Sequence, residues 1–218
     1  MVTVIVLAKA PVPGRVKTRL CPPCDPEQAA ALAEAALVDT LRSVTATRCE
    51  RRVLVLDGAP GPWLPAGFEV LPQRGYRLDE RLAHAFTDTG TGGVLIGMDT
   101  PQVTPARLTA ALRALGAPGV GAVLGPSVDG GWWALGLRTP DPGVFLGVAM
   151  STPHTGDAQR ARLHELRLRT AALPTLRDVD DFDDALAVAR TAPGSRFAAT
   201  LRSMLPRLRA LDDTLAAR

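Results

Sequence analysis

Short apolar segments rich in β-branched residues alternate along this chain with longer segments of helical periodicity, and this order constrains the fold most. The sequence T-V-I-V-L-A at 3–8 is typical of a strand buried on both faces of a parallel sheet. Further strands are expected at 52–57, 68–71, 93–97, 121–124, 132–137 and 168–172, and helices at 26–45, 78–87, 105–115, 155–166 and 181–190. This alternation predicts an α/β fold, a three-layer sandwich with a mostly parallel central sheet.

The chain has 218 residues, of which 46% are apolar, and this is enough for one domain with a substantial core. No linker rich in Pro, Gly or Ser divides it, and no repeat recurs at a fixed period. We therefore expect a single domain over residues 1–218, with 195–218 as a C-terminal helical extension. The scattered arginines of that extension predict a solvated helix face rather than a site for a polyanion.

Composition argues against several classes of protein. A net charge of +3 with 4% aromatic residues is unlike a nucleic-acid-binding domain. No apolar run reaches ~18 residues and no signal-peptide pattern is present, so we expect a cytoplasmic protein without a membrane anchor. Cys21 and Cys24 have a CxxC spacing, but a structural zinc site needs a second pair and the two intervening prolines oppose a redox helix. We expect free thiols, and a monomer or a homodimer.

The basic residues are unevenly distributed. Of 25 basic residues only Lys9 and Lys17 are lysines, and both lie in the loop after the first strand. A compact ammonium and a guanidinium are not interchangeable, so this confinement indicates a specific role, with residual codon drift as the alternative. Two prolines and Gly14 exclude regular structure from the loop, and Asp25 followed by Pro26 predicts the start of a helix.

A strand that ends in a basic, glycine-containing loop and leads into a helix is typical of phosphate binding. Neither the Walker pattern nor the dinucleotide-binding glycine pattern is present, which leaves the phosphate loops of nucleotide-sugar-type transferases. We expect Lys17 and Arg19 to act in catalysis. The residues expected to bind the nucleotide are Ala8, Lys9, Gly14, Arg15, Lys17 and Arg19.

Two aspartates are candidate metal ligands. Asp99 follows the strand at 93–97, and Asp180 precedes the helix at 181–190. A carboxylate that faces phosphates can hold Mg²⁺ or Mn²⁺, because these hard cations combine one or two carboxylates with phosphate oxygens. A turn or cap is the alternative role for Asp99, and Asp178 is the alternative partner to Asp180.

The acceptor is expected beside the turn that joins the fifth and sixth strands. Glycines there would let backbone N–H groups approach a ligand closely, and one of the two tryptophans that follow would face the pocket while the other is core. The expected acceptor-binding residues are Asp129, Gly130, Gly131, Trp132, Ser151 and Thr152. The alternation of side chains does not decide between Trp132 and Trp133.

These motifs together resemble the nucleotide-diphospho-sugar transferase superfamily, which has the glycosyltransferase-A fold. Five motifs occur in order, at 8–20, 97–101, 125–133, 151–152 and 178–180, and they resemble the bacterial group of arsenosugar-biosynthesis-type glycosyltransferases. The stretches at 17–20, 129–131 and 178–180 are also similar to 2-phospho-L-lactate guanylyltransferases. The chain departs from the group pattern at 75–78, at Trp132-Trp133 and at Met150, all near the expected acceptor or base pocket.

The resemblance implies a transferase that binds a nucleotide and a small-molecule acceptor. Only one aspartate stands at the Asp99 motif, whereas glycosyltransferases usually have a double-aspartate motif. We therefore expect a metal-dependent nucleotidyltransferase that joins an NTP to a small phosphorylated acceptor and releases pyrophosphate. A glycosyltransferase that uses a nucleotide sugar is the alternative, and a non-catalytic nucleotide-binding protein is a further one.

Overall fold

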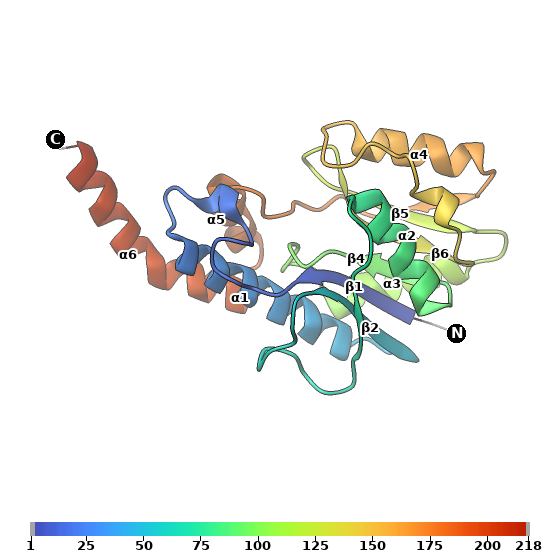
Figure 1. The fold of residues 1–218 in the computed structure, drawn as a ribbon, viewed down its shortest axis with the longest axis horizontal. Coiled ribbons are helices and arrows are strands. Elements are labelled where there is room, and N and C mark those ends of the chain that lie inside the picture. The colour runs from blue at the N-terminus through green and yellow to red at the C-terminus, as the bar shows by residue number, and fades with distance from the viewer. Residues whose placement is uncertain (1–2, 217–218) are drawn as a thin grey trace.

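The protein folds around one sheet with helices on both faces (Figure 1). The computed structural model describes residues 3–216, and the side chains of residues 3–206. The strands in this part of the chain are β1 (Thr3–Lys9), β2 (Arg51–Asp57), β3 (Glu69–Pro72), β4 (Gly93–Ile96), β5 (Ala122–Pro126), β6 (Trp132–Leu137) and β7 (Thr170–Ala172). The helices are α1 (Pro26–Thr45), α2 (Leu78–Thr89), α3 (Pro105–Gly116), α4 (Thr155–Glu165), α5 (Phe182–Thr191) and α6 (Arg196–Ala216), with short 3₁₀ turns η1 (Thr18–Leu20) and η2 (Pro142–Val144).

The sheet has the strand order β3-β2-β1-β4-β6-β5-β7 and is mostly parallel, as predicted. Only β6, among the described strands, runs antiparallel to its neighbours, β4 and β5. The reversal has a functional consequence. It brings the beginning of β6, at Trp132, to the edge of the sheet where β1, β4 and β5 end.

Alternating side chains of β1 divide the core into two layers. Val4 and Val6 face a cluster that includes α1 and α3, whereas Ile5 faces a cluster that includes α2, η2 and α4. Residues on adjacent positions of a strand point to opposite faces, so the continuous apolar run at the start of the chain fills both layers. This confirms the three-layer α/β architecture.

Local signals in the sequence set the helix boundaries. Asp25 caps α1 through a reciprocal hydrogen-bond pair with Gln28, and Pro26 occupies the first helical position. Asp181 caps α5 in the same way through Asp184. At the far end of the molecule α6 packs on α1 and α5 (Figure 1), and both carboxylate oxygens of Asp39 accept hydrogen bonds from the first N–H groups of α6.

Among the helices of residues 3–216, none is both long enough and apolar enough to cross a membrane. Cys21, Cys24 and Cys49 are free thiols, as expected. The predicted C-terminal extension is helical from Arg196 to Ala216. The arginines beyond residue 206 lie outside the described side chains, so the solvated face expected there stays a prediction.

Candidate functional site

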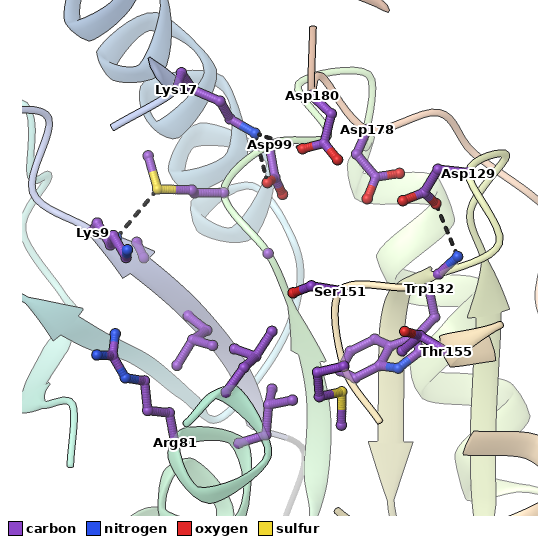
Figure 2. A pocket seen from close by; sticks show the side chains of 18 of the residues that line it. Lys9, Lys17, Arg81, Asp99, Asp129, Trp132, Ser151, Thr155, Asp178 and Asp180 are labelled. Atoms are coloured by element: carbon purple, nitrogen blue, oxygen red, sulfur yellow. Dashed lines mark hydrogen bonds and ion pairs between the residues drawn. The ribbon is translucent and has the colours of Figure 1, made fainter. Parts of the chain in front are cut away.

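A cavity of about 690 Å³ opens where β1 and β4 end. One wall is the end of β1 and the segment that follows it: Lys9 is the last residue of β1, and Arg15, Lys17 and Arg19 come from the following segment. Arg81 of α2 adds another cation (Figure 2). Ala8 lies in the same wall. Five of the six residues expected to bind the nucleotide therefore line one cavity.

Gly14, the sixth of these residues, is not among the described residues that line the cavity. It has a φ of 73°, a backbone conformation that favours glycine. A Cβ atom there would meet nothing within 4 Å. Its contact with the nucleotide stays a prediction, and what the structure shows is a glycine that turns the chain.

Lys17 reaches from this wall to the carboxylates. Its Nζ lies 2.9 Å from Oδ2 of Asp99 and 3.5 Å from Oδ1 of Asp180, and it also donates to the carbonyl oxygen of Val179. Burial alone would lower the pKa of Lys17, but attraction to Asp99, its hydrogen bond, and the charges of Asp180 and Asp178 together raise that pKa above its usual value. Lys17 is therefore a fixed, buried ammonium at physiological pH.

Four carboxylates form the upper rim of the cavity. Figure 2 shows Asp99, Asp180, Asp178 and Asp129 in a row. The backbone N–H of Val179 donates to the carbonyl oxygen of Asp99 over 2.9 Å, which joins the segment after β4 to the segment before α5. Burial, together with the negative charges of Asp99 and Asp129, raises the pKa of Asp178 to about 7.

The donor atoms at this rim fit a hard divalent cation. Oδ1 of Asp178 is buried and has no hydrogen-bond partner among the described residues, and Asp99 and Asp180 add further carboxylate oxygens. Within residues 3–206, no group of three or more His, Cys, Asp or Glu side chains is arranged as a closed metal site. Mg²⁺ commonly uses one or two carboxylates and completes its coordination with phosphate oxygens and water, so an open set of this kind suits that ion. Asp99 and Asp180 stay predicted ligands.

The opposite wall contains most of the residues expected to bind the acceptor. Asp129, Gly131, Trp132, Ser151 and Thr152 all line the cavity. Trp133 is only 3% exposed, and its indole N–H donates to the carbonyl of Pro174 over 2.9 Å. The indole N–H of Trp132 is buried without a partner among the described residues, and its ring lies 6.4 Å from that of Phe145. Trp132 is thus the tryptophan that faces the cavity.

The glycine turn has a different role from the one expected. The N–H of Gly130 donates to Ser127 and the N–H of Gly131 donates to the carboxylate of Asp129, so neither is free to bind a ligand. A Cβ atom on Gly130 would lie 1.9 Å from the carbonyl oxygen of Pro153. Gly130 is not among the described residues that line the cavity, and its contact with the acceptor stays a prediction. The turn instead holds the start of α4 close to β6.

Two residues of the site, Arg81 and Gln73, are not predicted from the sequence. Arg81 projects from α2 and its Nη1 lies 3.3 Å from Oδ2 of Asp57. Gln73 donates from its side chain to the carbonyl oxygen of Ala8 over 2.7 Å. Both come from segments that meet the end of β1 only after the sheet has formed, and their spacing in the sequence carries no signal of this.

Comparison with known proteins places this chain in a family. Residues 32–152 match the model of a family described as uncharacterized proteins conserved in bacteria (DUF2064). The chain belongs to this family. A search of the curated proteins finds no match.

Solved structures share the fold. The crystal structure of a proposed nucleotide-diphospho-sugar transferase from Desulfovibrio desulfuricans G20 matches 96% of this chain and 97% of its own length, with a TM-score of 0.85 and 26% identity. CMP:2-keto-3-deoxy-manno-octonic acid synthetase in complex with CTP matches 88% and 99% of the two chains, with a TM-score of 0.57 and 9% identity. A cytidylyltransferase from Leptospira borgpetersenii matches 95% of each chain, with a TM-score of 0.55 and 11% identity.

The predicted nucleotide-diphospho-sugar transferase fold is confirmed by these matches. The protein from Desulfovibrio desulfuricans is described as a proposed nucleotide-diphospho-sugar transferase, and this supports the transferase class predicted for the present chain.

Proposed function

We propose that this protein is a metal-dependent nucleotidyltransferase, which joins an NTP to a small phosphorylated acceptor and releases pyrophosphate. The observation that carries the proposal is the arrangement of one cavity, in which the cations Lys9, Arg15, Lys17 and Arg19 and the carboxylates of Asp99 and Asp180 line the same space. Phosphates bound there would be neutralised on one side by the protein and on the other by a metal ion. One neighbour described as a cytidylyltransferase and another described as a CMP-linked synthetase in complex with CTP support a reaction of this kind.

Lys17 would change partners when the nucleotide binds. Without ligand its ammonium lies between Asp99 and Asp180. Asp99 and Asp180 would hold a metal ion, which supplies positive charge to the phosphates when bound. Lys17 would leave the two carboxylates, because like charges repel. Lys17 would then donate to the phosphate oxygens, while Arg19, whose side chain is 73% exposed, would contact the departing pyrophosphate.

The reaction itself needs positioning more than covalent help from the protein. An oxygen of the acceptor's phosphate attacks the α-phosphorus of the nucleotide, the bond from that phosphorus to the bridging oxygen breaks, and its electron pair leaves with pyrophosphate. Trp132, Ser151 and Thr152 would place the acceptor opposite the leaving group. The cations of the loop would stabilise the charge that develops on it.

A glycosyl transfer from a nucleotide sugar is the second candidate, and one observation favours it. Among the described residues that line the cavity, every basic side chain belongs to the end of β1, the loop after it or α2. The wall formed by Asp129, Trp132, Ser151 and Thr152 contains none. A phosphorylated acceptor would find no direct cationic partner there. An acceptor that presents a hydroxyl group meets no such conflict.

The products decide between the two reactions. The purified protein would be incubated with each NTP, Mg²⁺ and a panel of sugar phosphates and phosphorylated acids, and pyrophosphate would be measured. We expect pyrophosphate to form in equal amount with a nucleoside diphosphate derivative of the acceptor. Release of a free nucleoside diphosphate from a nucleotide sugar, without pyrophosphate, would establish glycosyl transfer. Nucleotide binding without either product would indicate a non-catalytic nucleotide-binding protein.

A further inference from the structure

A second cavity, of about 850 Å³, lies among α1, the segment after β4, the segment before α5 and the connection from α5 to α6. Three separate elements each contribute an arginine to its lining: Arg42 comes from α1, Arg107 from α3, and Arg177 from the segment before α5. The proposed reaction uses none of these three side chains.

The positive charge of this cavity is only partly compensated. Arg177 pairs with Asp184 over 2.6 Å, and Arg107 uses one N–H to donate to the carbonyl oxygen of Gln102 over 3.1 Å. A guanidinium has five N–H donors, so most of those of Arg107 are still available. Arg42 makes no hydrogen bond or ion pair with any side chain that the structure describes, and the surplus charge of the cavity rests on Arg42 and Arg107.

The acidic residue in the lining has another role. Asp39 is 9% exposed, and its two oxygens accept the N–H groups of Arg196 and Phe197 at 3.0 Å and 2.8 Å. Its charge is therefore directed to the positive end of α6, and it does not pair with Arg42 one turn away on α1. The first turn of α3, capped by Thr104, adds a positive helix end at the rim of the cavity.

The same chain segments form the lining of both cavities. Arg177 precedes Asp178, and Val128 precedes Asp129. In each pair one residue lines the second cavity and its neighbour lines the first, as expected for extended chain whose side chains alternate in direction. Two hydrogen bonds join the segment before α5 to the segment after β4: Gln102 donates to the carbonyl oxygen of Arg177, and the N–H of Val179 donates to the carbonyl oxygen of Asp99.

We propose that the second cavity binds a small phosphorylated anion, held by the guanidinium groups of Arg42, Arg107 and Arg177. Planar guanidinium groups match phosphate oxygens in geometry as well as charge. The shared chemistry is a phosphate group with two or more negative charges, and it can come from inorganic pyrophosphate or from a nucleoside monophosphate. Because the two cavities share walls, an anion bound in the second one would bear on the positions of Asp99 and Asp178.

The proposal is tested by binding and needs no turnover. Titration calorimetry would measure the binding of inorganic pyrophosphate and, separately, of AMP, in the presence of a chelator. The protein would be the Lys17→Ala variant, in which the ammonium of the first cavity is absent. A double variant, Arg42→Glu with Arg107→Glu, would be compared with Arg48→Glu plus Arg113→Glu. The control pair has the same change of net charge, and its residues are exposed and lie outside the described lining of either cavity.

We expect the Lys17→Ala protein to bind at least one of the two anions. The Arg42 and Arg107 double variant should weaken that binding by about tenfold or more, because hydrogen bonds to charged groups are among the strong ones. The control pair should change it by less than about threefold, since exposed charges that do not contact the anion are weakened by solvent and salt. Arg42→Ala alone is a milder change for the case in which the charge-reversed double variant does not fold. It should also weaken binding.

Two results would overturn the proposal. Neither anion binds to the Lys17→Ala protein, or the control pair weakens binding as much as the pair in the cavity does. Binding of both anions would identify the phosphate group as the ligand, and binding of AMP alone would identify a nucleotide. A protein that binds anions here but has no transferase activity would contradict the proposed function and leave this site in place.

Discussion

The ammonium of Lys17 lies 2.9 Å from the carboxylate of Asp99, so the cation expected to bind phosphate and an acid expected to bind metal are paired with each other. Both side chains are restrained. Lys17 is 12% exposed, and the backbone of Asp99 is held by the N–H of Val179. The pair therefore keeps two opposite charges in position in the absence of substrate. With substrate bound, Lys17 would pair with phosphate and Asp99 would hold a metal ion.

Replacement of Lys17 by alanine should reduce turnover by about 10²–10³-fold, as the loss of one preorganised charge-stabilising donor typically does. The partly exposed carboxylates of Asp99 and Asp180 would lose their shared cationic partner, so a modest fall in the thermal midpoint is also expected. Steady-state kinetics with saturating metal and nucleotide would measure the first effect. Near-normal turnover in a folded Lys17→Ala protein would show that this ammonium is not part of the reaction.

Asp99→Asn should weaken metal-dependent nucleotide binding by about tenfold or more, because a charged partner is replaced by a neutral one of the same shape. Folding should be retained with a modest fall in the thermal midpoint, since Lys17 loses its nearest carboxylate but the backbone bond between Val179 and Asp99 does not involve the side chain. Calorimetric titration of a nucleotide, once with Mg²⁺ and once with excess chelator, would measure how far nucleotide affinity depends on the metal in the wild-type protein and in the variant. Equal affinity of the wild-type protein under the two conditions would contradict a metal role for Asp99.

The sequence predicts the elements of this fold well because the signals are local. The capped start at Asp25 and the apolar run to Thr45 define α1, and the structure gives the same bounds. The apolar, β-branched run at the N-terminus predicts a strand buried on both faces, and β1 lies inside the sheet between β2 and β4. The basic loop and Asp99 are found because each follows directly from a strand end.

The relations between elements could not be read from the sequence. Alternation places Trp132 and Trp133 on opposite faces of β6, but only the antiparallel insertion of that strand between β4 and β5 decides which one meets the cavity. Gly130 is needed for the approach of Pro153, a contact between segments that no local pattern reveals. Arg81 also reaches the site through packing between elements: α2 lies against β1, and this places Arg81 in the lining of the cavity.

The two tryptophans should respond differently to truncation. Trp133→Ala removes a buried ring and leaves the carbonyl of Pro174 without its donor, so we expect a loss of about 3–5 kcal/mol in the free energy of unfolding. Trp132→Ala should cost much less stability and should raise KM for the acceptor. Urea unfolding and kinetics of both variants would measure these effects. Equal losses of stability, with no change in acceptor KM for Trp132→Ala, would contradict the assignment.

The stability of the metal-free protein should fall as pH rises from about 4 to 7, because of Asp178. Its pKa is raised from 3.8 to about 7 in the folded state, so over this range the unfolded chain has lost a proton that the folded protein still binds. Unfolding is then favoured by rising pH, by at most about 4 kcal/mol in total at 1.36 kcal/mol per unit. Above pH 7 both states are ionised and the loss is complete.

Asp178→Asn removes this titration, so the variant should gain stability over the wild-type protein progressively between pH 4 and pH 7, and the gain should level off above that range. Chemical denaturation in chelator at several pH values measures the difference directly. Asp183→Asn is the matched control, since Asp183 is exposed at the start of α5. If Mg²⁺ binds beside Asp178 it should reduce the gain, because a nearby cation stabilises the ionised carboxylate. A difference between variant and wild type that is the same at pH 4 and pH 8 would show that Asp178 is not held in its neutral form by burial and by its acidic neighbours.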